Sequence, residues 1–256
     1  MQTTFIGIDL AWSVDRNHSG IVVLRGDERG ARFVTSSNDL KALTGVVEFV
    51  QEHSSESTVV AVDAPLIVNN TTGSRECELE IGRRFGRFQA SCHSNNLTRN
   101  PQPAGVRLVE ALAPLGFRHD FDIARVRQRK GQWLFEVYPH PAMVVLFRLK
   151  RIIRYKKGTV AQRRRGLRVL QRHLRTLTEG SGGLIGTLEL QDLLSQNLLD
   201  LRGKALKRYE DTLDALFCAY LAWHCWRWGK ASNEQIGGLD GGYIVVPTGV
   251  GGVEHG

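Results

Sequence analysis

Five carboxylates in this chain stand at positions where they could do chemistry. Asp9 and Asp63 each end a run of apolar, β-branched residues that predicts a buried strand, "TFIGID" and "STVVAVD". Asp211 and Asp214 lie three residues apart in a predicted helix, so they share one helix face. Glu136 ends a further predicted strand, within "GQWLFEVYPHPA". Because a lone ionised carboxylate in a buried strand is costly to desolvate, a partner or a ligand must approach Asp9.

Carboxylates gathered in this way are typical ligands of hard divalent cations. If the strands that end at Asp9 and Asp63 are parallel neighbours, both side chains reach the edge of the sheet where ligand sites gather. Asp214 lies beside the apolar stripe of its helix, whereas Asp211 could simply favour the start of that helix. Mg²⁺ or Mn²⁺ would neutralise such a cluster. Two such ions about 4 Å apart can hydrolyse a phosphodiester. We therefore predict a catalytic metal site of Asp9, Asp63, Asp211 and Asp214, with Glu136 as a further catalytic carboxylate.

The elements that must position these carboxylates follow from hydrophobic periodicity and from turn residues. Strands are predicted at 3–10, 19–25 and 30–36, and their short polar links suit an antiparallel meander. A helix to about Glu52 and the strand that ends at Asp63 come next. Further helices are predicted at 74–87, 104–115, 160–177, 187–199 and 204–228, and a last strand at 242–247. We see no linker or internal repeat, and expect one α/β domain over residues 1–256.

Positive charge is concentrated in one part of the chain. The net charge is +8, and no acidic residue lies between Glu136 and Glu179. Twelve cations occupy that interval: Arg148, Lys150, Arg151, Arg154, Lys156, Lys157, Arg163, Arg164, Arg165, Arg168, Arg172 and Arg175. Because these charges repel one another unless an anion lies nearby, we expect nucleic acid as the partner, with Arg163, Arg164 and Arg165 binding it. A solvated helix face is the alternative.

Three other residues are weaker candidates for substrate binding. Arg75 and Arg83 belong to a predicted helix and could hold phosphate, although a solvated helix would also carry them. His140 lies between two prolines just after the predicted strand that ends near Pro139, so it is rigidly presented.

Several classes of protein are not expected. The chain has no apolar run of about 18 residues and no basic-then-apolar signal sequence, so we expect no membrane association and a cytoplasmic location. The four cysteines have spacings that match no tetrahedral zinc pattern. Cys218 and Cys225 lie seven residues apart on one helix face and are expected to pack in the core.

Six motifs in order resemble the DUF429 family, a group predicted to be nucleases of the ribonuclease H-like superfamily. They are "GIDLAW", "VVAVDAPL", Arg75–Glu78, "FEVYPHPA", "EDTLDALFCAY" and "GYIVVP", and they extend from Phe5 to Pro247. The resemblance implies a five-stranded mixed sheet in the order 3-2-1-4-5, flanked by helices. The chain departs from that fold in a long, helical insertion between strands 4 and 5, at about 66–131, which could form a lid or a partner surface.

The same resemblance implies roles for the acidic residues. Holliday-junction resolvases of this fold place one acid on the first strand, one at the end of the fourth, and an Asp-x-x-Asp pair on a late helix. Asp9, Asp63 and the pair Asp211 and Asp214 match these places, although resolvases usually carry Glu where Asp63 stands. The resemblance also leaves a homodimer open.

Three functions remain as hypotheses at this point. The first is a metal-dependent nuclease that acts on DNA or RNA. The second is a phosphotransferase of the actin and sugar-kinase superfamily, which would need further phosphate loops; the Gly-rich stretch at 237–242 lies very late in the chain for one. The third is a nucleic-acid-binding module whose nuclease site is inactive.

Overall fold

The computed structural model describes residues 2–13, 17–120, 122–127, 130–180 and 182–249. Its strands are β1 (Thr3–Asp9), β2 (Ser19–Asp27), β3 (Gly30–Leu40), β4 (Thr58–Val62), β5 (Phe117–Arg118), β6 (Gln132–Glu136), β7 (Leu184–Ile185), β8 (Asn233–Gly238) and β9 (Gly242–Pro247). Its α-helices are α1 (Ala42–His53), α2 (Glu76–Phe85), α3 (Ala104–Leu112), α4 (Pro139–Leu146), α5 (Val160–Thr176), α6 (Leu188–Ser195) and α7 (Gly203–Trp228). Short 3₁₀ helices cover Gly86–Phe88, Ala113–Leu115 and Gly229–Ala231.

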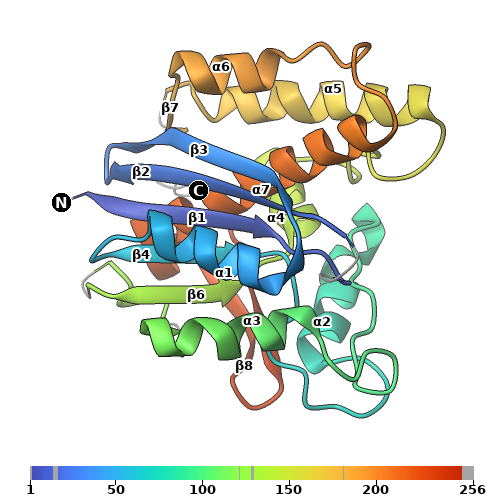
Figure 1. Cartoon of the computed structure of the whole chain (residues 1–256). Coiled ribbons are helices and arrows are strands. Elements are labelled where there is room, and N and C mark those ends of the chain that lie inside the picture. Colours follow the sequence, from blue (N-terminus) through green and yellow to red (C-terminus); the bar gives the residue numbers. More distant parts are fainter. Residues whose placement is uncertain (1, 14–16, 121, 128–129, 181, 250–256) are drawn as a thin grey trace.

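A mixed sheet forms the centre of the molecule, with helices on both faces (Figure 1). Within the described residues it has seven strands, in the order β5-β6-β4-β1-β2-β3-β7. The predicted count of five strands is therefore wrong. The two additional strands, β5 and β7, have two residues each and pair only at the edges of the sheet, so they leave no periodic pattern in the sequence. β1 pairs antiparallel with β2 and parallel with β4, which makes the strands ending near Asp9 and Asp63 parallel neighbours, as expected.

Alternation of side chains along the strands separates two hydrophobic cores. Phe5 of β1 packs with α7, α5 and α4, whereas Ile6 and Ile8 pack on the other face with α1 and α3. Asp9 follows the same alternation as Phe5 and therefore belongs to the α7 face. The helices that follow β4 in the chain are accordingly not all a detached insertion: α3 covers one face of the central sheet.

Glycine lets the central helix approach the sheet closely. A Cβ atom at Gly7 would lie 2.0 Å from the amide nitrogen of Ala219 and 2.1 Å from the carbonyl oxygen of Ala215, both in α7. A Cβ atom at Gly20 would lie 2.5 Å from the carbonyl oxygen of Asp211. Any larger residue would push α7 away from β1 and β2, so these glycines bring the acidic turn of α7 against the strand that ends at Asp9.

The structure differs from the predicted elements in the region after β6. β6 ends at Glu136, before the predicted end of the strand near Pro139, and α4, which was not predicted, begins there. Pro139 lies in the first turn of α4, where a missing amide hydrogen costs nothing. The last predicted strand forms a hairpin, β8–β9, that packs on α2 and α4 around Cys77, Ile244 and Val246. Within the described residues, no helix has the length and apolar character needed to cross a membrane.

Candidate functional site

Three elements bring the predicted aspartates to one region. Asp9 is the last residue of β1, and Asp63 directly follows β4, with its amide donating a hydrogen bond to the carbonyl of Ile8. Asp214 lies in the middle of α7 and is fully buried. The charges of Asp63, Asp211 and Asp214 all act on Asp9, so the four carboxylates form one electrostatic cluster. We call Asp9, Asp63 and Asp214 the carboxylate cluster.

A lysine and a tyrosine from the segment before α5 face this cluster. The Nζ of Lys156 lies 2.9 Å from Oδ2 of Asp214 and 4.0 Å from Oδ2 of Asp63. The hydroxyl of Tyr155 donates a hydrogen bond of 2.6 Å to Oδ1 of Asp214. The carboxylate of Asp9 forms no hydrogen bond or ion pair with any residue that the structure describes. Lys156 therefore pairs with two of the three carboxylates, and Lys207, which is paired with Asp211, adds a second positive charge that acts on Asp9 and Asp63.

The excess of negative charge in the carboxylate cluster affects the pKa values of its members. Burial raises the pKa of Asp63 to about 7, against the opposing effect of Lys156, and the charges of Asp214 and Glu136 raise it further. Burial likewise raises the pKa of Asp9 well above its usual value, again against Lys156. Without a further cation, ionisation of these groups is therefore unfavourable in the folded protein.

This protonation predicts a pH dependence of stability. Because the pKa of Asp63 is raised from 3.8 to about 7, the folded state binds more protons than the unfolded state between these values. The free energy of unfolding of the metal-free protein should therefore fall as the pH rises from about 4 to about 7. Urea denaturation in EDTA should show that the free energy of unfolding falls less over this pH range for Asp63→Asn than for wild type. An equal fall in both proteins would mean that Asp63 does not cause it.

Asp211 has a different environment from the other three aspartates. Its carboxylate is paired with Lys207, one turn earlier in α7. Lys207 also lies 3.1 Å from Glu210, which is buried and accepts a second ion pair of 3.0 Å from Arg163. Asp211 and Glu210 thus belong to a neutralised network at the start of α7, and Asp211 is less suited to a metal than was predicted.

Glu136 and Arg75 are paired with each other. The Arg75 guanidinium donates hydrogen bonds of 2.8 and 2.6 Å to the two carboxylate oxygens of Glu136, and one of 3.0 Å to the carbonyl of Ile67. Its Nε donates to Glu78, and the amide of Leu66 donates to Glu136. Both side chains of the Arg75–Glu136 pair are almost fully buried. Their predicted roles, catalysis for Glu136 and phosphate binding for Arg75, are therefore not supported, because each already satisfies the other.

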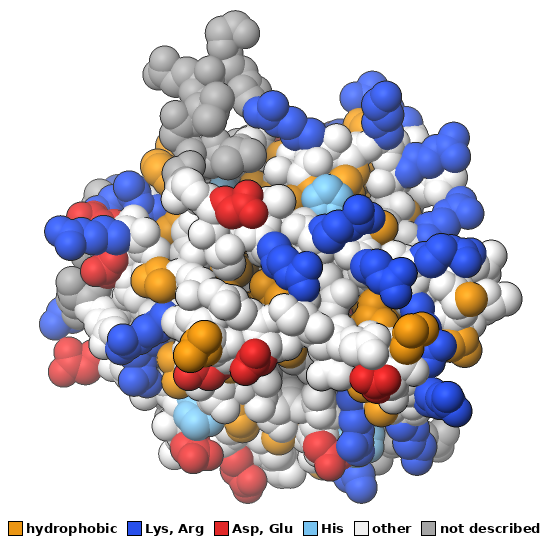
Figure 2. All heavy atoms as spheres, turned by 90° about the horizontal axis from the view of Figure 1, so that it is seen from above, with side chains coloured by type: hydrophobic (Ala, Val, Ile, Leu, Met, Phe, Trp, Pro, Cys, Tyr) orange, Lys and Arg blue, Asp and Glu red, His pale blue; other side chains and the backbone are white. Residues whose placement is uncertain are grey.

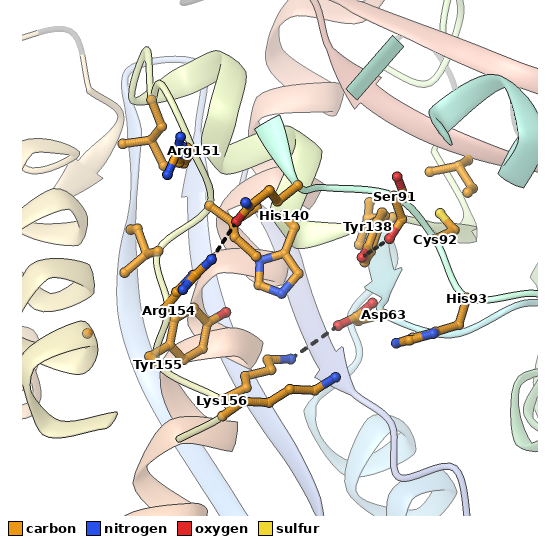
Figure 3. A pocket seen from close by; sticks show the side chains of 18 of the residues that line it. Asp63, Ser91, Cys92, His93, Tyr138, His140, Arg151, Arg154, Tyr155 and Lys156 are labelled. Carbon is orange, nitrogen blue, oxygen red and sulfur yellow. Dashed lines mark hydrogen bonds and ion pairs between the residues drawn. The ribbon is translucent and has the colours of Figure 1, made fainter. Parts of the chain in front are cut away.

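A pocket of about 1250 Å³ opens beside the carboxylate cluster; we call it the main pocket. Asp63 and Lys156 line it, whereas Asp9, Asp211 and Asp214 are not among its lining residues. Figure 3 shows Arg154, Tyr155 and Lys156 along one side of the pocket and Ser91, Cys92 and His93 across from them, with Asp63 between. The cluster therefore meets the solvent-accessible space of the pocket through Asp63 and its ion pair with Lys156.

Members of the basic run have different surroundings in the structure. Seen from the side of α5 and α6, Lys and Arg side chains gather over one half of the face (Figure 2). Arg164 donates to the carbonyls of Leu199 and Leu201, and Arg163 pairs with Glu210, so these two connect α5 to its neighbours. Four others line the main pocket, and we call them the basic wall: Arg151, Arg154, Lys157 and Arg165. Of the three arginines predicted to bind nucleic acid, only Arg165 is in a position to do so at this pocket.

His140 and Arg83 complete the predicted residues. His140 lines the main pocket, with its ring packed against those of Tyr138 and Tyr155. Burial lowers the pKa of His140 to about 4, and Lys156 lowers it further, so the imidazole is neutral at pH 7 and cannot bind phosphate as a cation. Arg83 is exposed, pairs with Glu80 at 3.0 Å and does not line either described pocket.

The cluster fits a hard cation in chemistry but not in its present spacing. Oxygen donors from Asp9, Asp63 and Asp214 suit Mg²⁺ or Mn²⁺. Apart from Lys156, Oδ2 of the buried Asp214 has no polar partner among the described residues. No three acidic, histidine or cysteine side chains in the described part of the chain lie close enough together to enclose one ion. Binding would therefore require these side chains to close around the ion and the Lys156 ammonium to withdraw.

Sequence reasoning missed Tyr155 and Lys156 as members of the site. Lys156 was one of twelve cations in the basic run, and nothing in its local pattern separates it from Lys157. Cys218 and Cys225 are buried in the core, as the sequence predicted. Cys92 lines the main pocket, where burial raises the pKa of its thiol.

Comparison with known proteins gives one match. The family model described as "Protein of unknown function (DUF429)" matches residues 7–234, which include the carboxylate cluster, the main part of the pocket and all of α7. No curated protein and no solved structure matches the chain.

Proposed function

The chain belongs to the DUF429 family, a family described as one of unknown function, and from its own residues we propose that it is a divalent-metal-dependent nuclease that hydrolyses phosphodiester bonds in DNA or RNA. The ribonuclease H-like architecture is part of the same proposal. It is supported by an antiparallel β1–β2–β3 meander followed by parallel β4 and β6.

The observation that carries the proposal is the under-neutralised carboxylate cluster beside a basic pocket. Asp9, Asp63 and Asp214 converge from two strand ends and a buried helix, and among the described residues only Lys156 forms an ion pair with any of them. Lys207, which is paired with Asp211, adds one further positive charge that acts on Asp9 and Asp63. Maintaining such a cluster costs stability, as the raised pKa values of Asp9 and Asp63 indicate. A function that uses the negative charge accounts for that cost, and metal binding is such a function.

Each group in the site then has a role. Asp9, Asp63 and Asp214 would hold Mg²⁺ or Mn²⁺, which supplies charge neutralisation at the scissile phosphate and activation of the attacking water. Tyr155 orients Asp214 through its hydrogen bond. Lys156, once released from Asp214, is free to contact a phosphate oxygen. The basic wall binds the flanking phosphates, and the neutral His140 can accept or donate a hydrogen bond in the pocket.

Metal-dependent melting and cleavage test the proposal together. A cation at ten times its Kd stabilises the folded state by about 1.4 kcal/mol. At about 2–4 °C per kcal/mol, the Tm should rise by a few degrees between EDTA and about 5–10 mM Mg²⁺ or Mn²⁺. The protein should also cleave at least one member of a panel of single- and double-stranded DNA and RNA in the presence of metal. If neither a Tm rise nor cleavage occurs, the nuclease proposal fails.

The position of Lys156 favours one second candidate, a nucleic-acid-binding module without catalytic activity. In that case the ammonium would be the permanent counter-ion of Asp214 and Asp63. Binding of DNA or RNA without a metal-dependent rise in Tm and without cleavage would identify the protein as such a non-catalytic binding module. The phosphotransferase hypothesis has no such support, because its Gly-rich stretch at 237–242 forms the turn of the β8–β9 hairpin.

A further inference from the structure

The main pocket has two walls of different chemistry. One is the basic wall, of which Arg151, Lys157 and Arg165 are exposed and form no ion pair among the described residues. The other comprises Ser91, Cys92 and His93 (Figure 3). The exposed indole of Trp12 also lines the pocket. No acidic or basic group other than His93 belongs to the segment 91–95 of that second wall. The pocket is therefore asymmetric: its basic wall carries cations that are unpaired in the described part of the chain, whereas the other wall is polar or aromatic. Among the other charged residues of the lining, Arg75, Glu78 and Glu136 are paired with one another.

A second, smaller pocket continues the first past Trp12. It has a volume of about 430 Å³, and Trp12, His93 and Asn95 line both pockets. Its far end is lined by Asn96, Arg99 and Asn100. Trp12 is 58% exposed, although most large aromatic side chains of the chain are buried. The indole thus stands between two connected hollows, with Asp63 in the wall of the larger one.

We propose that these connected pockets bind an unpaired nucleic acid strand, with its phosphates on the basic wall and a base stacked on Trp12. The proposal deepens the proposed function and rests on it in taking the polyanion to be nucleic acid. An unpaired strand presents phosphates along one side and open base faces along the other, which matches the asymmetry of the walls. A duplex presents phosphates on its outside and hides its base faces by stacking, so it has no partner for an exposed indole.

Binding measured without metal tests this inference separately from catalysis. The probes are fluorescein-labelled 12-nucleotide single strands of DNA and RNA, and the DNA duplex of the same sequence. Anisotropy is recorded in EDTA over a range of KCl concentrations. We expect both single strands to bind about tenfold more tightly than the duplex. Equal or tighter binding of the duplex would overturn the proposal.

Two substitutions with matched controls locate the strand. Trp12→Ala should weaken single-strand binding about tenfold, because stacking on an aromatic side chain contributes that much per base. Trp228→Ala, which alters a tryptophan outside both pockets, should leave it unchanged. Arg165→Gln should reduce the slope of log K against log salt by about 0.7, the value for one phosphate of a single strand. Arg172→Gln, two turns further along α5 and outside the pockets, should preserve the slope.

The outcomes separate this inference from the proposed nuclease activity. Single-strand binding that depends on Trp12 and Arg165 but is never followed by metal-dependent cleavage would sustain the inference and refute the nuclease. Cleavage of duplexes with single strands untouched would sustain the nuclease and refute the inference. The inference would also be refuted if Trp12→Ala and Arg165→Gln proteins, with the same Tm as wild type, bound single strands as tightly and with the same salt dependence as wild type.

Discussion

Asp9→Asn is expected to abolish metal-dependent cleavage while making the metal-free protein more stable. Loss of one carboxylate ligand should remove several kcal/mol of metal-derived stabilisation of the transition state, or about 10³-fold in rate. In EDTA the same change removes a desolvated carboxylate that has no hydrogen bond or ion pair among the described residues. Because burial and the neighbouring carboxylates outweigh the attraction of Lys156 for Asp9, the Tm should rise. Addition of Mn²⁺ should raise the Tm of wild type but not that of the variant.

Asp9 is a cleaner test than Asp214 for a structural reason. Asp214 accepts the hydrogen bond of Tyr155 and pairs with Lys156, so Asp214→Asn loses native interactions as well as a charge. Asp192→Asn, which changes an exposed aspartate of α6, is the matched control and should alter neither cleavage nor the metal response. If Asp9→Asn lowers the Tm in EDTA and retains cleavage, Asp9 is a structural residue and the metal site is misplaced.

The largest effect on stability is expected from Glu136→Gln. The Arg75–Glu136 pair is almost fully buried, and removal of one charge leaves the Arg75 guanidinium with Glu78 as its remaining acidic partner. Breaking a buried ion pair costs about 3–5 kcal/mol. Urea denaturation should show a loss of this size. Glu234→Gln, which breaks the half-exposed pair between Glu234 and Arg84, should cost less than about 1 kcal/mol.

The same variant decides whether Glu136 is catalytic. If Glu136 has only a structural role, the Glu136→Gln protein should retain the Mn²⁺-dependent rise in Tm. At a low temperature at which it is still folded, it should also cleave at a rate close to that of wild type. If Glu136 holds metal or moves a proton, the metal response or the rate should fall even where the protein is fully folded. A small change in stability together with a large loss of rate would contradict our assignment of the pair to the scaffold.

Local sequence was sufficient for the parts of the site that depend on short-range patterns. A continuous apolar run reaches Asp9 and another reaches Asp63, and the structure places Asp9 at the last position of β1 and Asp63 directly after β4. The three-residue spacing of Asp211 and Asp214 placed them on one helix face, and the apolar stripe beside Asp214 indicated its burial. Hence the acidic centre was predictable, as was membership of the DUF429 family.

Tertiary structure alone decided which charges are satisfied. Arg75 reaches Glu136 across 61 residues, and Tyr155 reaches Asp214 across 59, and no local pattern encodes either contact. Arg163, Arg164 and Arg165 are consecutive, but the 100° turn between neighbours on a helix directs Arg163 to Glu210, Arg164 to backbone carbonyls and Arg165 to the pocket. A sequence lists charges, whereas only packing determines their partners. For this reason the sequence predicted that Asp9, Asp63 and Asp214 come together, whereas the pairing of Lys156 with this cluster and the place of Arg165 in the pocket lining emerged only from the fold.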